Sequence, residues 1–481
     1  MASQICAKVS TPRWKVPFYA VPLASREEKH GREQPFFQKK RRQRVEHTQI
    51  RIGSSKKYFM NRLRSTLILL FACLASVGNA QQAMRLWYGT PAADWNAALP
   101  IGNGNLAAQI FGGVAVERLS LSEGMPSLTM GDLYLRFPDH TVYKGYTRDL
   151  NLSTAVASVN YTSKGVTYTR EYYASLCDSV FVVRLKASKP KSITCNLSMS
   201  TPRQKDRIYD TDGMLVLSGI SETNQQQSGK GRFITQVKPL LKNGRATIKD
   251  GVFSIDKADE ATLYISMATN VVNNQNVSAD EVSKCTRVLN RAYGKDFDLL
   301  KERHTAAFQQ QFERVTLDLG SSQQGLKSTD QRIREFSKTN DPSLVALYYQ
   351  YGHYRSICLS QPNAQLPFKM NGKYCGTSDI SEMLLQNQDD FMVVLPALPD
   401  SWKMGSVKGL KARGGFEFDM VWKNKVVETL TIKSLFGGLC RIGSSVELVG
   451  KGLKKAKGDS PYLLYDLKMR KNEIMVLTRK I

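Results

Sequence analysis

The stretch VNYTSKGVTYTREYYAS, Val159 to Ser175, decides the fold class of the N-terminal half of the chain. Apolar and polar residues alternate on both sides of a turn at Ser163–Gly165, which is the two-residue period of antiparallel strands. Two more hairpin signals follow at Asn243-Gly244 and Asp250-Gly251, because Asn, Asp and Gly tolerate the positive φ of tight turns. Many short strands with few helical patterns predict a large antiparallel β-sandwich.

A helical pattern begins near Asp280 and is interrupted once, near Gly294. A polar segment at 317–331 separates it from another helix, for which Asp341 is the expected N-cap and Pro342 the first residue. That helix is apolar nearly all round, which suits a helix buried on every side.

The spacing of Asp379 and Glu382 is that of a capping pair and predicts the start of a short helix over ISEMLLQ. After residue 390 the pattern returns to strands, with a hairpin expected in GGFEFDMVWKNKVVETLTIKS, 414–434. These patterns predict an α+β multidomain chain with an N-terminal antiparallel β-supersandwich, a helical linker and a small C-terminal β-sandwich domain.

Composition places the chain among ordinary globular proteins, since 42% of its 481 residues are hydrophobic and 23% are charged. The formal net charge of +26 is concentrated at the front, where residues 1–59 carry 14 Lys/Arg against 4 Asp/Glu. The run KKRRQR, 39–44, could belong to a nucleic-acid-binding arm. Such an arm has no place ahead of an export signal, so residues 1–59 are interpreted as a spurious or disordered extension, and no nucleic-acid partner is expected.

The export signal lies in MNRLRSTLILLFACLASVGNAQQ, which begins at Met60. Arginines precede an apolar run from Leu67 to Ala75, and small residues lead to an expected cleavage after Ala80. The run is too short to span a bilayer, which needs about 20 residues, so an exported periplasmic or extracellular protein without a stable membrane span is predicted. Lipoprotein processing at Cys73 is the alternative, and the bulky residue two positions before it fits that signal poorly.

Cysteine and histidine usage gives no sign of a metal or cofactor. No cysteine after the signal lies in a CxxC pair, and only three histidines follow it, so buried free thiols are expected and a metal site is not. The six cysteines are Cys177, Cys195, Cys285, Cys358, Cys375 and Cys440.

Six segments, in this order, resemble the inverting α-L-fucosidases of glycoside hydrolase family 95. They are LWYGTPAADWNAALPIGNGNLAAQIFGGVAVERLSLSEG, GDLYLRF, YTREYYAS, RHTAAFQQQFERVTLDLG, LVALYYQYGHYRSICLSQPNAQLP and EMLLQNQDDFMVVLPALPDSWKMGSVKGLKARGGFEFDMVW. The resemblance implies a sandwich, a helical linker, an (α/α)6 barrel that carries the active site, and a small C-terminal β domain. It implies hydrolysis of terminal α-linked fucose, and hence a fucosylated oligosaccharide or glycan as partner.

The expected organisation follows from these observations together. It is a basic extension at 1–59, a signal peptide at 60–80, the N-terminal β-sandwich at 81–279, a helical linker at 280–340, a remnant of the helical barrel at 341–389, and a C-terminal β domain at 390–481.

The stretch LPFKMNGKYC, 366–375, resembles the family's Leu-Pro-x-Asn-Leu-Gln-Gly-x-Trp segment after the first barrel helix. On this alignment Lys369, Asn371 and Tyr374 replace the motif's Asn, Gln and Trp, and they are the candidate substrate-binding residues. An alternative alignment places Asn371 on the family's catalytic aspartate, where an amide cannot act as a general base. The segments that carry the family's catalytic acid and base are absent on either alignment.

Chain length leads to the same expectation. Between Thr329 and Gln388 there is room for two or three helices of about 12 residues, whereas the barrel is a double ring of twelve. The first hypothesis is therefore a fucosidase-family hydrolase that is catalytically incomplete, and the alternative is a non-catalytic carbohydrate-binding or scaffold β-sandwich protein. Among the aromatic residues Trp87, Trp95, Tyr172 and Tyr173, core packing is favoured over a sugar-stacking platform.

Overall fold

The computed structural model describes residues 84–123, 128–203, 206–221, 231–272, 276–358, 377–388 and 390–481. Contacts divide the chain into two units, Met1–Thr66 and Leu67–Ile481, and every described residue belongs to the second. The basic extension at 1–59 and the signal peptide at 60–80 lie outside the described residues, as do the candidate site residues at 369, 371 and 374.

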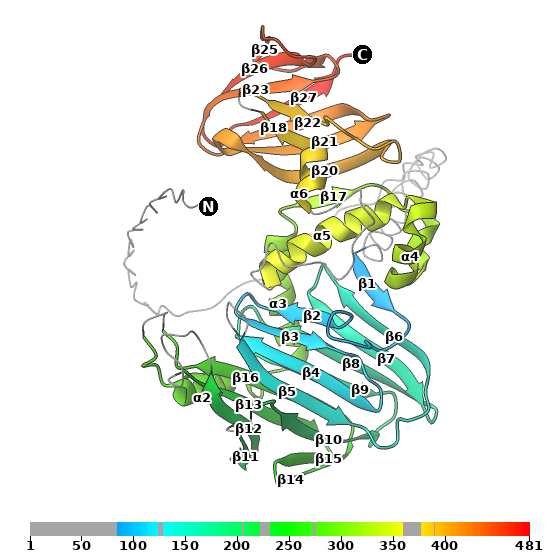
Figure 1. Ribbon diagram of the computed structural model, residues 1–481, viewed down its shortest axis with the longest axis vertical. Coiled ribbons are helices and arrows are strands. Elements are labelled where there is room, and N and C mark those ends of the chain that lie inside the picture. The colour runs from blue at the N-terminus through cyan, green and yellow to red at the C-terminus, as the bar shows by residue number, and fades with distance from the viewer. Residues whose placement is uncertain are drawn as a thin grey trace, which may run out of the picture. The chain divides into compact units, whose positions relative to one another are not determined.

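The N-terminal part is built on two antiparallel sheets, and the larger has nine strands (Figure 1). In spatial order these are β1 (Arg85–Tyr88), β6 (Lys144–Asn151), β7 (Val156–Ser163), β8 (Val166–Ala174), β9 (Phe181–Ala187), β16 (Glu260–Thr269), β13 (Gly231–Lys242), β12 (Met214–Ser221) and β11 (Arg207–Thr211).

The second sheet has seven strands. They are β14 (Arg245–Lys249), β15 (Val252–Ala258), β10 (Ile193–Ser200), β5 (Leu128–Arg136), β4 (Val116–Glu123), β3 (Leu106–Ile110) and β2 (Leu99–Gly102). Burial alternates along β4, β7 and β10, as the sequence pattern predicts for strands with one face in a core. The sandwich prediction is therefore confirmed.

The predicted turns have the backbone that their residues favour. Lys164 and Gly165 between β7 and β8 have φ of 49° and 71°, and Asp250 and Gly251 between β14 and β15 have φ of 51° and 72°. Positive φ at both central residues is typical of a type I′ hairpin turn, whose twist matches that of the flanking strands. Asn243 and Gly244 also have positive φ, but they connect β13 to β14, which lie in different sheets, so the hairpin predicted there was wrong.

A buried ion pair joins the two sheets across the core. Arg170 on β8 lies 3.4 Å from Glu117 on β4, and both side chains are almost fully buried. Tyr172 donates a hydrogen bond to the same carboxylate at 2.8 Å. Arg170 also donates to the backbone carbonyls of Gly113 and Val114, both at 2.6 Å. Because a buried charge needs a partner and further hydrogen bonds, this cluster fixes the register of the two sheets.

Two helices follow the sandwich, α2 (Glu281–Ala292) and α3 (Phe297–Phe312). Asp280 caps α2 through Ser283, and the break between the helices falls at Gly294, where φ is 80°, as the sequence predicts. Side chains of α2 and the first turn of α3 pack on the outer face of the nine-stranded sheet. This is why β16 is buried on both faces.

The C-terminal part contains two smaller sheets (Figure 1). The six-stranded sheet has β17 (Thr316–Asp318), β20 (Met404–Ala412), β21 (Phe416–Lys423), β22 (Val426–Ser434), β27 (Ile474–Arg479) and β24 (Leu448–Val449). The five-stranded sheet has β18 (Leu385–Asn387), β19 (Met392–Val394), β23 (Gly438–Ser444), β26 (Leu463–Met469) and β25 (Leu453–Lys455). The predicted 414–434 hairpin is β21 and β22, and the α+β fold class is confirmed.

Between the two parts the structure describes α4 (Thr329–Thr339), α5 (Pro342–Cys358) and α6 (Thr377–Leu384), with a short 3-10 helix at Gln323–Leu326. Asp341 accepts a hydrogen bond from the amide of Leu344, so α5 begins as predicted. The prediction for α6 was wrong in its bounds. The helix starts two residues before Asp379 and ends at Leu384, because Leu385 already pairs with Val394 in a strand.

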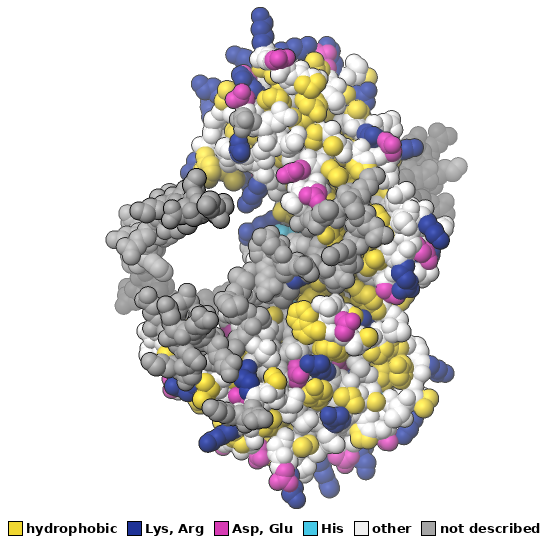
Figure 2. Space-filling model, viewed as in Figure 1, with side chains coloured by type: hydrophobic (Ala, Val, Ile, Leu, Met, Phe, Trp, Pro, Cys, Tyr) yellow, Lys and Arg dark blue, Asp and Glu magenta, His cyan; other side chains and the backbone are white. Residues whose placement is uncertain are grey.

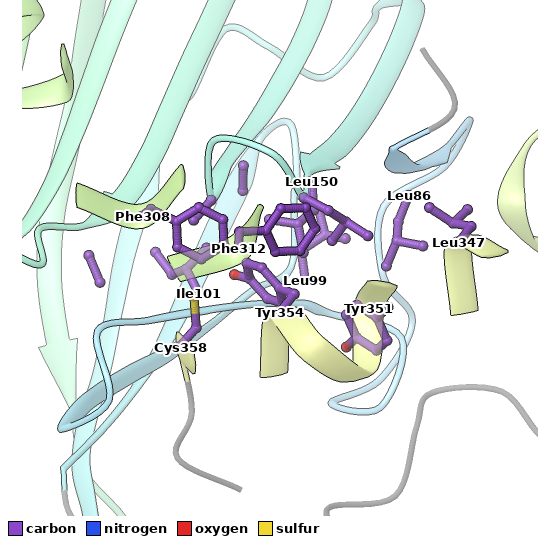
Figure 3. Close-up of a cluster of buried hydrophobic side chains, with 14 of the residues drawn as sticks. Leu86, Leu99, Ile101, Leu150, Phe308, Phe312, Leu347, Tyr351, Tyr354 and Cys358 are labelled. Atoms are coloured by element: carbon purple, nitrogen blue, oxygen red, sulfur yellow. The ribbon is translucent and has the colours of Figure 1, made fainter. Parts of the chain in front are cut away.

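Helix α5 lies against the sandwich and against elements of the linker (Figure 3). Tyr354 donates a hydrogen bond to the Pro100 carbonyl on β2 at 2.8 Å, and Gln350 donates to the Val315 carbonyl at 3.1 Å. Tyr354, Tyr351 and Leu347 share an apolar cluster with side chains of β1, β2 and α3. A helix expected to be buried on every side is thus covered in part by the sandwich and by α3.

Candidate functional site

The segment that contains the predicted site residues begins at the end of α5, and the end of α5 is anchored to the sandwich. The amide of Gly104, in the turn between β2 and β3, donates a hydrogen bond to the carbonyl of Cys358 at 2.7 Å. Cys358 is the last residue of α5 and Thr377 is the first of α6, so 18 residues, 359–376, connect the two helices. The structure therefore describes the point at which the segment begins and the residues around it, but none of the three predicted substrate-binding residues.

The turn between β2 and β3 is held by its own asparagine. Asn103 accepts hydrogen bonds from the amides of Asn105 and Leu106 at 3.2 and 2.9 Å, and it donates to the Ser175 carbonyl at 3.1 Å. Every polar atom of this side chain is therefore used to shape the turn. Asn103 is a structural residue.

Glu123, at the end of β4, is the one described carboxylate in this area with a free oxygen. Its Oε1 atom accepts a hydrogen bond from Asn105 at 3.2 Å, whereas its Oε2 atom is buried without a hydrogen-bond partner. The ammonium of Lys284 lies 4.0 Å from Oε1. Burial raises the pKa of this carboxyl, and Lys284 and Asn105 oppose the shift. A carboxyl with a raised pKa is the type of group that can donate a proton.

Each of the other buried carboxylates among the described residues forms an ion pair with a basic side chain. Four such pairs span 2.7 to 3.4 Å, and each leaves its carboxylate engaged with structural partners. The pairs are Glu117 with Arg170, Glu281 with Arg232, Asp178 with Lys295, and Asp341 with Arg332. The described residues thus offer Glu123 as a candidate acid. Asp132 and Asp206 also have one buried oxygen each without a hydrogen-bond partner, but each is paired with an arginine, Arg118 at 2.8 Å and Arg203 at 2.9 Å.

Sequence analysis did not single out Glu123, although a signal was present. In VERLSLSE, Leu119, Leu121 and Glu123 occupy alternate positions, and the structure buries all three. A carboxylate at an inward position of an alternating strand marks either an ion pair or an unusual acid. Glu117 in the same strand forms an ion pair with Arg170, whereas Glu123 has no basic side chain as close.

Of the four aromatic residues considered for sugar stacking, two are core residues. Tyr172 and Tyr173 are fully buried, Trp87 is half-buried, and Trp95 is 56% exposed. Core packing is therefore the correct interpretation for the two tyrosines. The indole ring of Trp95, in the loop between β1 and β2, is exposed to solvent.

The described residues contain no group of three or more His, Cys, Asp and Glu placed to hold a metal ion. Four of the five described cysteines are buried free thiols, as predicted, and Cys177 is exposed; Cys375 lies outside the described residues. In the part of the chain that the structure describes, no helix combines the length and apolarity needed to cross a membrane.

Domain models of carbohydrate-active enzymes match most of the described chain, and they define its class as glycoside hydrolase. Residues 86–126 and 122–274 match the N-terminal domain of glycosyl hydrolase family 65. Residues 296–381 match the catalytic domain of glycosyl hydrolase family 95, and residues 386–464 match the C-terminal domain of that family. These matches support an assignment to glycoside hydrolase family 95, whose two domain models cover residues 296–381 and 386–464.

Two curated relatives agree with this assignment. "Alpha-L-fucosidase 2" of Arabidopsis thaliana is 28% identical over 360 residues, which cover 59% of this chain and 43% of the relative. "Probable alpha-fucosidase A" of Aspergillus niger is 27% identical over 247 residues, 47% of this chain and 30% of the relative. The chain thus spans less than half the length of either relative.

Among solved structures, a human-microbiome protein assigned as a kojibiose phosphorylase shares 8% identity at a TM-score of 0.38. That match covers 58% of this chain and 42% of the other.

Proposed function

We propose that this chain derives from an inverting α-L-fucosidase and, in its present form, does not hydrolyse α-L-fucosides. The family assignment and the fucosidase relatives support the lineage. An inverting hydrolase needs an acid and an opposed base about 6.5–9.5 Å apart, with a water between them. The observation that carries the second part is the 18-residue connection between α5 and α6.

That connection is too short to supply the rest of a barrel. The described residues between 276 and 388 form five α-helices, α2 to α6, and α2 and the first turn of α3 pack on the outer face of the N-terminal sheet. At about 12 residues per helix plus connections, 18 residues hold one more helix at most. A double ring of twelve helices cannot be completed, and α5 already packs on the sandwich instead.

The decisive experiment is turnover of a chromogenic α-L-fucoside by the purified chain. We expect no release above that of a matched preparation from cells without the gene. Chromophore release that co-purifies with the chain would overturn the proposal. If Glu123→Gln also abolished this release, Glu123 would be the acid. Release unaffected by Glu123→Gln would also overturn it, and would show that a group other than Glu123 is the acid.

A second candidate function is non-catalytic carbohydrate binding, and Trp95 favours it. A ring that is 56% exposed in a family of sugar-processing proteins offers an apolar face to a sugar ring. We expect the chain to be retained on immobilised fucosylated glycan and Trp95→Ala to weaken retention, with Val142→Ala as an exposed control. Equal retention of Trp95→Ala and the parent chain would remove Trp95 from the candidates.

We also propose that the chain is exported, on the strength of the signal-peptide pattern at 60–80. N-terminal sequencing of the protein recovered outside the cytoplasm should begin near Gln81. Peptides from residues 1–40 in that material would contradict the proposal.

A further inference from the structure

The C-terminal sheets carry one exposed aromatic ring among the described residues of 390–481, that of Phe436 at 74% exposure. It lies in the turn between β22 and β23, and its other face rests on a turn built of glycines. A Cβ added to Gly415, where φ is 74°, would fall 2.2 Å from Cδ2 of the Phe436 ring. The glycine therefore lets the backbone support the ring while most of the ring stays open to solvent.

A second turn fixes the position of the first. The amide of Asn472 donates to the Ser434 carbonyl at 2.7 Å, and the amide of Ser434 donates to the Glu473 carbonyl at 3.0 Å. Gly437 packs closely enough that a Cβ there would lie 3.1 Å from the Lys471 amide nitrogen. The loop that carries Phe436 and the loop of residues 470–473 thus form one rigid corner.

The second turn carries polar residues, and its backbone lies next to Gly437, the residue after Phe436. Arg470, Lys471 and Asn472 are all exposed, and no ion pair involving Arg470 or Lys471 is found among the described residues. The nearby carboxylate of Glu473 accepts a hydrogen bond from the Arg470 amide.

Positive charge extends beyond this corner. Residues 390–481 carry 17 Lys/Arg against 9 Asp/Glu, and Figure 2 shows Lys and Arg side chains gathered over the C-terminal sheets. Two acidic groups here are occupied by local cations, Glu447 by Lys455 and Asp466 by Arg441.

We propose that this corner is a binding site for an acidic carbohydrate, one that bears sulfate or carboxylate groups. Phe436 stacks on the apolar face of a sugar ring, and Arg470 and Lys471 bind the anionic substituent. Single-stranded nucleic acid is disfavoured because its sites use a series of aromatic rings along a groove, and one ring is exposed here. The proposal rests on the carbohydrate-linked function proposed above, but it does not require catalysis.

The test measures binding of the full chain to sulfated dextran, neutral dextran and oligothymidylate at about 50 mM salt, where surface charges are weakly screened. We expect the sulfated polymer to bind best. Phe436→Ala should weaken that binding about tenfold, the loss of one stacking contact, and Phe436→Trp should preserve it. Arg470→Ala/Lys471→Ala should weaken it and flatten its salt dependence.

Matched controls come from the N-terminal sandwich. Val142→Ala, at a side chain 79% exposed, and Lys189→Ala/Lys249→Ala, at two exposed lysines, should each change binding less than twofold. Melting temperatures should stay unchanged for all variants. An unchanged affinity of Phe436→Ala, equal losses in the control variants, or tighter binding of oligothymidylate would each overturn the proposal. Fucoside turnover would overturn the proposed function and leave this result intact.

Discussion

Replacing Tyr354 tests whether α5 is truly held by the sandwich. The hydroxyl donates to the Pro100 carbonyl at 2.8 Å, and the side chain is fully buried. Tyr354→Phe removes the hydrogen bond and leaves the carbonyl without that donor, a cost of about 1–3 kcal/mol in the free energy of unfolding. Tyr354→Ala also removes a buried aromatic ring, which costs about 3–5 kcal/mol.

Urea unfolding followed by circular dichroism measures these losses, and hydrogen exchange read by mass spectrometry locates them. Exchange should rise in the peptides that cover β2 and α5, while peptides of β21 and β22 should remain protected. Tyr209→Phe is the matched control, since that side chain is 40% exposed on β11 and should change stability by less than about 0.5 kcal/mol.

The reasoning would be refuted if Tyr354→Phe matched the control and exchange in β2 did not change. That outcome would mean that α5 detaches from the sandwich in solution. Its apolar surface would then be open, and the chain should aggregate on expression. Poor solubility of the parent chain would support the same conclusion.

Three further perturbations follow from buried groups. Burial raises the pKa of the Cys195, Cys285, Cys358 and Cys440 thiols to about 12, so a maleimide at pH 7 should label exposed Cys177 in the folded chain and these four only in urea. Burial lowers the pKa of His304 to about 4, so its contribution to stability is present above about pH 6.5 and lost as pH falls toward 4. His304→Phe should flatten that part of the pH profile of urea unfolding, and an unchanged profile would contradict it. Glu117→Gln should lower the unfolding free energy by about 3 kcal/mol because Arg170 loses its buried counter-charge, whereas Glu123→Gln should leave it unchanged or raise it by up to about 1 kcal/mol; similar losses at both positions would be inconsistent with the free oxygen of Glu123.

The fold was predictable where local chemistry decides it. The Asp250-Gly251 hairpin turn requires a backbone that few other residues adopt, and Asp341-Pro342 defines a helix start through a cap and a fixed φ. The bounds of α6 were not predictable, because Leu385 could continue the helix by propensity. Its strand conformation comes from pairing with Val394, a contact outside the local sequence.

The candidate site was less predictable for a different reason. Lys369, Asn371 and Tyr374 were chosen by alignment to a family motif and lie outside the described residues, so their roles remain predictions. Glu123 was missed because its role depends on the absence of a partner for Oε2, which no sequence pattern reports. Likewise the exposure of Phe436 depends on two glycine-rich turns that meet only in the folded chain.

The stability of the scaffold and the chemistry of the family are separable in this chain. Arg170 and Glu117 join the two sheets of the sandwich through contacts within the sandwich itself. Helix α5 reaches that core through Tyr354 and lies against β17, which is itself an edge strand of a C-terminal sheet. Each contact is made by residues before 359 or after 376, so these contacts are compatible with the proposed loss of barrel segments between those positions. The proposed loss of catalysis is therefore compatible with a folded chain.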